Sequence, residues 1–205
     1  AKSSFFPDVF AAQLEYPSFP AALINTNYSD ISVPFFGLQT LNLYSYLNSE
    51  WQNLLGSSPL LMWSFSHAPV VCDVDLDGYQ DLVVIQDKVL HFINFSDITI
   101  QEKQIVFPDA LHAPVVYDNS LYVYSDAAIY RMKDFAVENY CSIPGVKGIA
   151  LWQDRVAVQL ENELKILKTT DFSELQSLAL PESFGAYNPV LWHHQDECLI
   201  FLTAD

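Results

Sequence analysis

The sequence is poor in glycine and in positive charge. Its 205 residues include six glycines and nine Lys and Arg against 25 Asp and Glu, a formal net charge of −16. Few glycines leave little room for phosphate-binding loops, and Gly-x-Ser-x-Gly, His-Glu-x-x-His and Cys-x-x-Cys motifs are all missing. An acidic surface repels phosphate backbones and anionic membranes. We therefore expect no nucleic-acid partner, and the sequence favours a binding role over catalysis.

Long hydrophobic runs and patterned cysteines are also lacking. No apolar run approaches the roughly 20 residues that span a bilayer, so we expect no membrane span. Cys72, Cys141 and Cys198 share no metal-ligand spacing and allow at most one disulfide, so their pairing stays open. Asn27 and Asn94 each begin an Asn-x-Ser sequon, which matters only in a secreted eukaryotic protein.

One short pattern recurs along the chain: a proline or its substitute, two small apolar residues, then a larger or aromatic one. Its copies occupy residues 20–23, 69–72, 114–117, 149–152 and 189–192, with starts 49, 45, 35 and 40 residues apart. A polar turn and further strand-sized apolar runs follow the copies. Strand units repeated at this spacing are typical of β-propeller blades.

The sequence therefore predicts an all-β fold, a β-propeller with four to five blade-like repeats. Residues 18–205 would form the blades, whose repeats start near 20, 69, 114, 149 and 189. Residues 1–17 would be an N-terminal extension or a closing strand, and the chain could instead be a fragment of a larger propeller. A β-sandwich is the alternative fold. Residues 38–55 are the one plausible helix, although part of that segment also fits a strand.

The strongest chemical signal is the acidic loop at residues 73–81. Carboxylates stand at loop positions 1, 3, 5 and 9, and a glycine stands at position 6. Calcium (Ca2+) takes six to eight oxygen ligands at ~2.3–2.6 Å, and a curled loop can direct alternate side chains at one centre. Position 12 is Val84 rather than the bidentate Glu of an EF-hand, and apolar strand-like runs flank the loop. The predicted ligands are Asp73, Asp75, Asp77 and Asp81, with the carbonyl of Tyr79.

This loop and its continuation resemble the calcium loop of FG-GAP repeats, the blades of the integrin α-subunit propeller and of many secreted bacterial propellers. The resemblance is specific over residues 67–95 and generic elsewhere. It implies side-chain ligation of calcium by the four aspartates and a ligand from the Tyr79 carbonyl. It also implies an extracellular, cell-surface or periplasmic module for adhesion or assembly, with a protein or glycan ligand.

An enzyme remains the alternative function, since polysaccharide lyases and quinone-dependent dehydrogenases also use propellers. A deep axial pocket lined by Arg, Lys or several His would favour it.

Histidine and tryptophan supply weaker candidates. His67 and His112 precede equivalent strands, so they could share a metal or ligand at the axis, or each could cap its strand by hydrogen bonding, which we favour. His193 and His194 are expected in a turn, where adjacent side chains diverge. Trp152 and Trp192 occupy equivalent repeat positions, which predicts packing between blades.

Overall fold

Strands make up all the regular structure in the described part of the chain. The computed structural model describes residues 24–26, 29–36, 41–47, 50–53, 67, 69–94, 101–180, 189–194 and 197–202. Within these residues no helix is long and apolar enough to cross a membrane. The all-β prediction is confirmed. The helical alternative for residues 38–55 is wrong, because β3 (Leu41–Leu47) and β4 (Glu50–Asn53) pair there as antiparallel strands.

The strands form five antiparallel sheets in the described residues, and consecutive strands are neighbours in each. The first sheet contains β1 (Ile24–Thr26), β2 (Ser29–Phe36), β3 and β4. The second contains β5 (Val70–Cys72), β6 (Asp81–Gln86), β7 (Val89–Asn94) and β8 (Gln101–Val106). The third contains β9 (Val115–Tyr117), β10 (Ser120–Tyr124), β11 (Ala128–Lys133) and β12 (Ala136–Ser142). The fourth contains β13 (Gly148–Trp152), β14 (Arg155–Gln159), β15 (Glu163–Lys168) and β16 (Glu174–Ala179), and the last pairs β17 (Val190–His194) with β18 (Glu197–Phe201).

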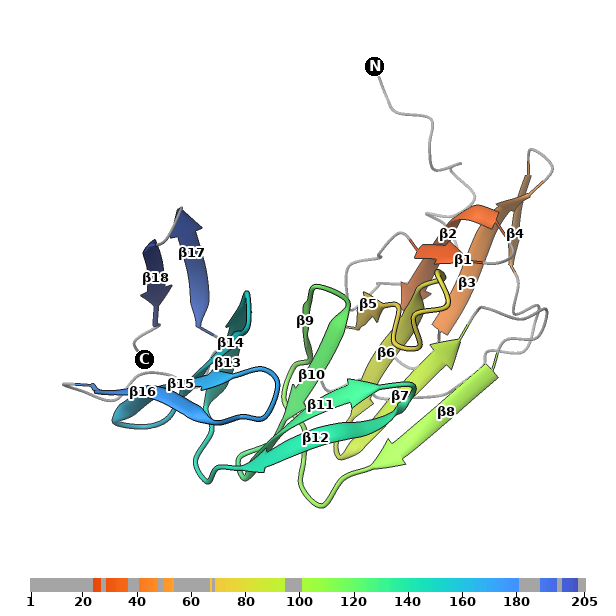
Figure 1. Cartoon of the computed structure of the whole chain (residues 1–205). Helices are drawn as coiled ribbons and strands as arrows, with labels where there is room; N and C mark the ends of the chain where they lie inside the picture. The colour runs from red at the N-terminus through yellow and green to blue at the C-terminus, as the bar shows by residue number, and fades with distance from the viewer. Residues whose placement is uncertain are drawn as a thin grey trace.

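The sheets follow one another in chain order, and the first strands of the last four lie side by side (Figure 1). β5 contacts β9, β9 contacts β13, and β13 contacts β17. Four predicted repeat starts coincide with these first strands, whereas residues 20–23 lie outside the described residues. Four successive sheets joined in this way are not the two face-packed sheets of a β-sandwich. The fold is β-propeller-like, and the number of blades in a complete ring stays a prediction.

The hydrophobic cores lie between neighbouring sheets, because alternate residues of a strand face opposite sides. In β10, Leu121 and Val123 pack toward the β5–β8 sheet, whereas Tyr122 and Tyr124 pack toward the β13–β16 sheet. Trp152 is 6% exposed and belongs to a third core that receives Ile200 from the last sheet. The predicted packing role of Trp152 is therefore confirmed; nothing is described of the Trp192 side chain.

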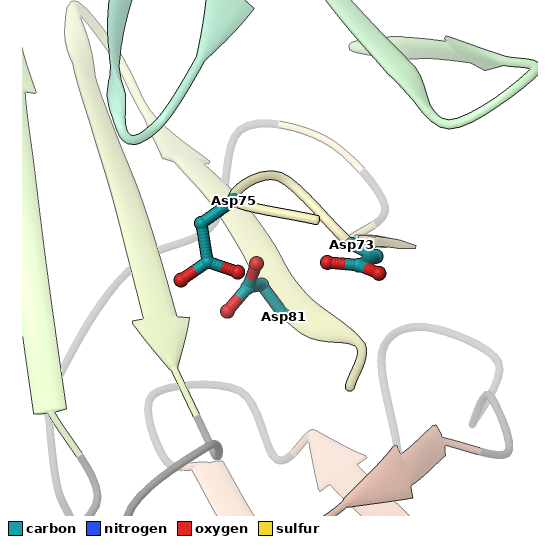
Figure 2. A group of neighbouring side chains, drawn as sticks. All are labelled: Asp73, Asp75 and Asp81. Carbon is teal, nitrogen blue, oxygen red and sulfur yellow. The ribbon is translucent and has the colours of Figure 1, made fainter. Parts of the chain in front are cut away.

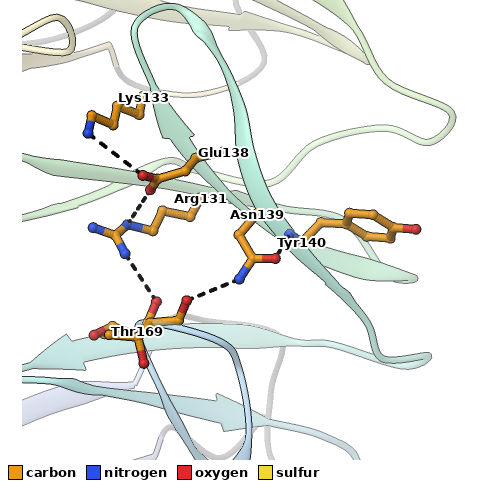
Figure 3. A network of polar contacts seen from close by, with 7 residues as sticks. Arg131, Lys133, Glu138, Asn139, Tyr140 and Thr169 are labelled. Carbon is orange, nitrogen blue, oxygen red and sulfur yellow. Dashed lines mark hydrogen bonds and ion pairs between the residues drawn. The ribbon is translucent and has the colours of Figure 1, made fainter.

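Polar contacts also join the β9–β12 and β13–β16 sheets (Figure 3). Arg131 donates to the carbonyl of Thr169 at 3.4 Å, and Asn139 donates from its side-chain amide to the carbonyl of Thr170 at 3.2 Å. Arg131 is held by an ion pair of 3.1 Å with Glu138. The turn between β15 and β16 is thus fixed to the preceding sheet by both apolar and polar contacts.

Candidate metal site in the β5–β6 loop

The acidic loop joins the first two strands of the β5–β8 sheet, as the sequence predicts. β5 ends at Cys72 and β6 begins at Asp81, so strands flank the loop on both sides. The backbone curls because Leu76 and Gly78 adopt positive φ angles of 60° and 94°. Glycine takes such angles without strain, whereas a leucine rarely does. Two left-handed residues in one short loop turn its aspartates toward a common centre.

Three of the four predicted carboxylates come together at that centre (Figure 2). Asp73, Asp75 and Asp81 each place an oxygen within 4.8 Å of the others. Asp81 is 1% exposed, and its Oδ2 accepts a hydrogen bond of 2.9 Å from the backbone amide of Val74. The amides of Asp77 and Gly78 donate to the two carboxylate oxygens of Asp73 at 3.1 and 3.0 Å.

Asp77 and Tyr79 occupy different places from those three. The Asp77 side chain is exposed, and its Oδ1 accepts a hydrogen bond of 2.8 Å from the amide of Tyr79. Asp77 therefore lies outside the three-carboxylate group. Ligation by Asp77 and by the Tyr79 carbonyl stays a prediction.

Asn94 is a member of the site that sequence reasoning missed. Its side-chain amide donates to Asp75 Oδ2 at 3.3 Å and to Asp81 Oδ1 at 2.9 Å. Asn94 is the last residue of β7 and lies 13 residues beyond Asp81, so no loop spacing signals its role. The sequence offered only its Asn-x-Ser sequon, and a side chain that is 5% exposed cannot serve as an accessible glycan acceptor in the folded protein.

The electrostatics of the group call for a positive charge. Asp75 Oδ1 is buried and has no hydrogen-bond partner among the described residues. Burial raises the pKa of Asp81 to about 7, although hydrogen bonds from Val74 and Asn94 lower it. Burial also raises the pKa of Asp75, and the charge of Asp77 adds to the effect. A cation among the three carboxylates would satisfy the unpaired oxygen and offset the repulsion, so the donor set fits a hard divalent ion.

The two histidines each form their own hydrogen bond. His67 donates from Nε2 to the carbonyl of Leu111 at 3.0 Å, and His112 donates from Nε2 to Asp126 at 2.7 Å. Their ring centroids lie 6.4 Å apart, and His112 stacks on Tyr124. Each histidine thus bonds to a residue outside the strand that it precedes, so strand capping stays a prediction.

The structure also describes the adjacent histidines of the last sheet and two of the three cysteines. His193 and His194 lie within β17, paired with Cys198 and Glu197, so the expectation that these two histidines lie in a turn is wrong. Cys72 and Cys141 are free thiols, and burial raises the pKa of Cys72 to about 11. The side chain of Cys198 lies outside what the structure describes.

A cavity of about 600 Å³ lies between the β9–β12 and β13–β16 sheets, at the opposite end of the strands from the acidic loop. Its lining contains one lysine and neither arginine nor histidine. The lining residues are Asp126, Pro144, Gly145, Val146, Lys147, Leu160, Glu161, Asn162 and Glu163.

No protein-family model and no curated protein matches the sequence. Among solved structures, BBS1N in complex with ARL6DN, soaked with mercury, aligns with a TM-score of 0.58 at 14% identity over 89% of this chain and 60% of that chain. Apo AztD from Citrobacter koseri aligns with a TM-score of 0.57 at 13% identity over 76% of this chain and 45% of that chain. The chain thus spans about half the length of the solved chains it resembles. At these identities the likeness shows the fold alone, which is β-propeller-like.

Proposed function

We propose that this chain is a calcium-stabilised β-propeller module that binds a protein or glycan partner. The observation that carries the proposal is the buried Oδ1 of Asp75, which has no hydrogen-bond partner in the described part of the chain, beside the carboxylates of Asp73 and Asp81. A buried ionised oxygen without a partner is costly, and a bound cation removes that cost.

Calcium fits this loop better than other common ions. The converging donors are carboxylate oxygens, whereas zinc in structural sites takes mainly Cys and His ligands. Magnesium keeps several waters and demands compact octahedral geometry, whereas calcium accepts many oxygens in flexible arrangements. Strands on both sides of the loop support the resemblance to FG-GAP blades. By that resemblance, Asp77 and the Tyr79 carbonyl would complete the ligand set.

We infer a binding, adhesion or assembly role from the position of the candidate site. The carboxylates belong to a loop that joins two strands, so the ion supports the fold. The BBS1N structure was solved in complex with ARL6DN, which illustrates that a propeller-like fold can hold a protein partner. Millimolar calcium is available outside cells, so we place the module at the cell surface, in the periplasm or in the extracellular medium.

The test is calcium binding to the whole chain after treatment with a chelator. Calorimetric titration should show one calcium site, with magnesium a poor substitute, and calcium should raise the melting temperature. Asp75→Asn preserves the side-chain volume but weakens the ligand, so it should remove most of the response. Equal melting of the wild-type chain with calcium and with chelator would contradict the proposal.

A further inference from the structure

Asn94 reaches the acidic site from outside the loop. It is the last residue of β7, the third strand of the β5–β8 sheet, whereas the three carboxylates belong to the β5–β6 loop and the start of β6. Its side chain is 5% exposed, so its amide is shielded from water and depends on protein partners. The amide nitrogen donates to Asp81 Oδ1 at 2.9 Å and to Asp75 Oδ2 at 3.3 Å.

These two hydrogen bonds determine which carboxylate oxygens of Asp75 and Asp81 are turned toward Asn94. An asparagine amide carries two N–H groups, which suffices for one bond to each carboxylate. With Oδ2 of Asp75 turned toward Asn94, the other oxygen, Oδ1, is the buried atom that has no partner among the described residues. Asp81 is held from two sides, since Val74 donates to its Oδ2 and Asn94 to its Oδ1.

We propose that Asn94 is a positioning residue of the metal site, which orients Asp75 and Asp81 so that Asp75 Oδ1 is presented to the ion. The inference rests on the calcium site proposed above. A neutral donor suits this position, because it fixes the carboxylates without neutralising them. A lysine or arginine there would supply the positive charge that the site otherwise takes from a cation. Residues that orient metal ligands typically contribute 10–100-fold to metal affinity.

The experiment compares Asn94→Leu and Asn94→Ser with the wild-type chain. Leucine has a similar volume and no donor, whereas serine retains one shorter donor and leaves room for water. Asn139→Ala is the matched control, because it removes an asparagine amide bond of 3.2 Å between sheets, away from the site. Circular dichroism and the melting temperature first establish that each variant is folded at the temperature of titration.

Two readouts separate positioning from a purely structural role. Calcium titration of the folded chains should give a Kd at least about tenfold weaker for Asn94→Leu, an intermediate value for Asn94→Ser, and no change for Asn139→Ala. Terbium, a luminescent substitute for calcium, should carry more bound water in both Asn94 variants, as lifetimes in H2O and D2O report.

The outcomes distinguish this inference from the proposed function. If the wild type binds calcium while both folded Asn94 variants match its Kd and hydration, the positioning role is overturned and the calcium site stands. If one Asn94 variant fails to fold, the other is judged by the same two readouts. If both fail, bound water is measured in terbium-loaded Asn94→Asp instead. A hydration equal to that of the wild type in that variant overturns the positioning role. A wild-type chain that binds no calcium overturns the proposed function and this inference together.

Discussion

The backbone carbonyl of Val74 accepts a hydrogen bond of 3.1 Å from the backbone amide of Asp134. Val74 belongs to the acidic loop and Asp134 to the turn between β11 and β12, so the bond joins two neighbouring sheets. The amide of Val74 donates to Asp81, and its side chain, 3% exposed, lies in the core between those sheets. One residue therefore connects a carboxylate of the metal site to the next sheet.

Calcium removal is expected to loosen both sides of this connection. At a hundredfold excess over Kd, a ligand that binds only the folded state stabilises it by ~2.7 kcal/mol. Hydrogen exchange measured with calcium and with chelator should show faster exchange after chelation at the amides of Val74 and Asp134. The amide of Leu160, bonded to Glu163 within the β14–β15 turn, is the internal control. Faster exchange at Val74 with no change at Asp134 would contradict the coupling.

We expect Phe135 to make the main apolar contact between the same two sheets. It is 9% exposed, adopts a positive φ of 57°, and packs edge-on against Phe92 with ring centroids 5.4 Å apart. Phe135→Ala would leave a cavity between the two sheets and should cost about 3–5 kcal/mol in the free energy of unfolding. Tyr140→Ala, at a residue 63% exposed, should cost less than about 1 kcal/mol. Urea unfolding of the two variants measures both values, and similar costs would refute the assignment.

In the β5–β8, β9–β12 and β13–β16 sheets, the sequence predicted the first three strands and missed the outer one. First and second strands are apolar because neighbouring sheets bury them, as in the fully buried β13. β12 and β16 are mostly exposed, and their apolar residues do not alternate regularly with polar ones, so they carry no hydrophobic periodicity that a sequence argument could use. They form because the third strand of the sheet offers them hydrogen bonds.

The residues of the candidate site also differ in whether the sequence could reveal them. Asp73, Asp75 and Asp81 could be predicted because their ligand spacing lies within one loop. Asn94 could not, since it meets them only through the pairing of β6 with β7. Phe135 and Phe172 are also invisible to local reasoning, because a phenylalanine in a turn at positive φ is held by contacts from the preceding sheet.

The stability of the fold should depend on His67 in mildly acidic solution. Burial lowers the pKa of His67 below 6.5, the Leu111 carbonyl raises it, and nearby His112, itself paired with Asp126, lowers it. The folded state therefore prefers neutral His67. Its contribution is fully present above the unfolded pKa of 6.5 and is lost as the pH falls through the lower folded pKa.

His67→Asn tests this dependence, because asparagine can still donate to Leu111 and does not titrate. Denaturant unfolding in saturating calcium, from about pH 7.5 to about pH 5, should give a flatter stability profile for the variant. At the upper pH the substitution should cost no more than about 0.5–1.5 kcal/mol, the range of one hydrogen bond, because the asparagine amide can replace the imidazole donor. Parallel profiles for the two proteins would exclude His67 as the titrating group.

Leu76 should be replaceable with a gain in stability. It is 59% exposed at a φ of 60°, where asparagine is tolerated far better than leucine. Leu76→Asn should raise the free energy of unfolding by up to ~1 kcal/mol and leave calcium affinity unchanged. A loss of stability on thermal or urea unfolding would mean that Leu76 makes a contact that its exposure conceals.

Asp75 and Asp77 should differ in their importance for calcium, although the sequence motif treats them alike. Asp75 contributes the buried oxygen without a hydrogen-bond partner among the residues that the structure describes, whereas Asp77 is exposed and accepts a hydrogen bond from Tyr79. Asp75→Asn should therefore abolish most of the calcium-dependent stabilisation, ~2.7 kcal/mol at a hundredfold excess. Asp77→Asn should retain a larger part of it, because three converging carboxylates remain.

Asp118→Asn, in the exposed β9–β10 turn, controls for the loss of one negative charge. Thermal melting of the three variants, with calcium and with chelator, decides the matter. Equal losses in Asp75→Asn and Asp77→Asn would show that Asp77 turns inward to bind the ion, as the FG-GAP resemblance implies, and would reject the three-carboxylate arrangement as the complete set of acidic ligands.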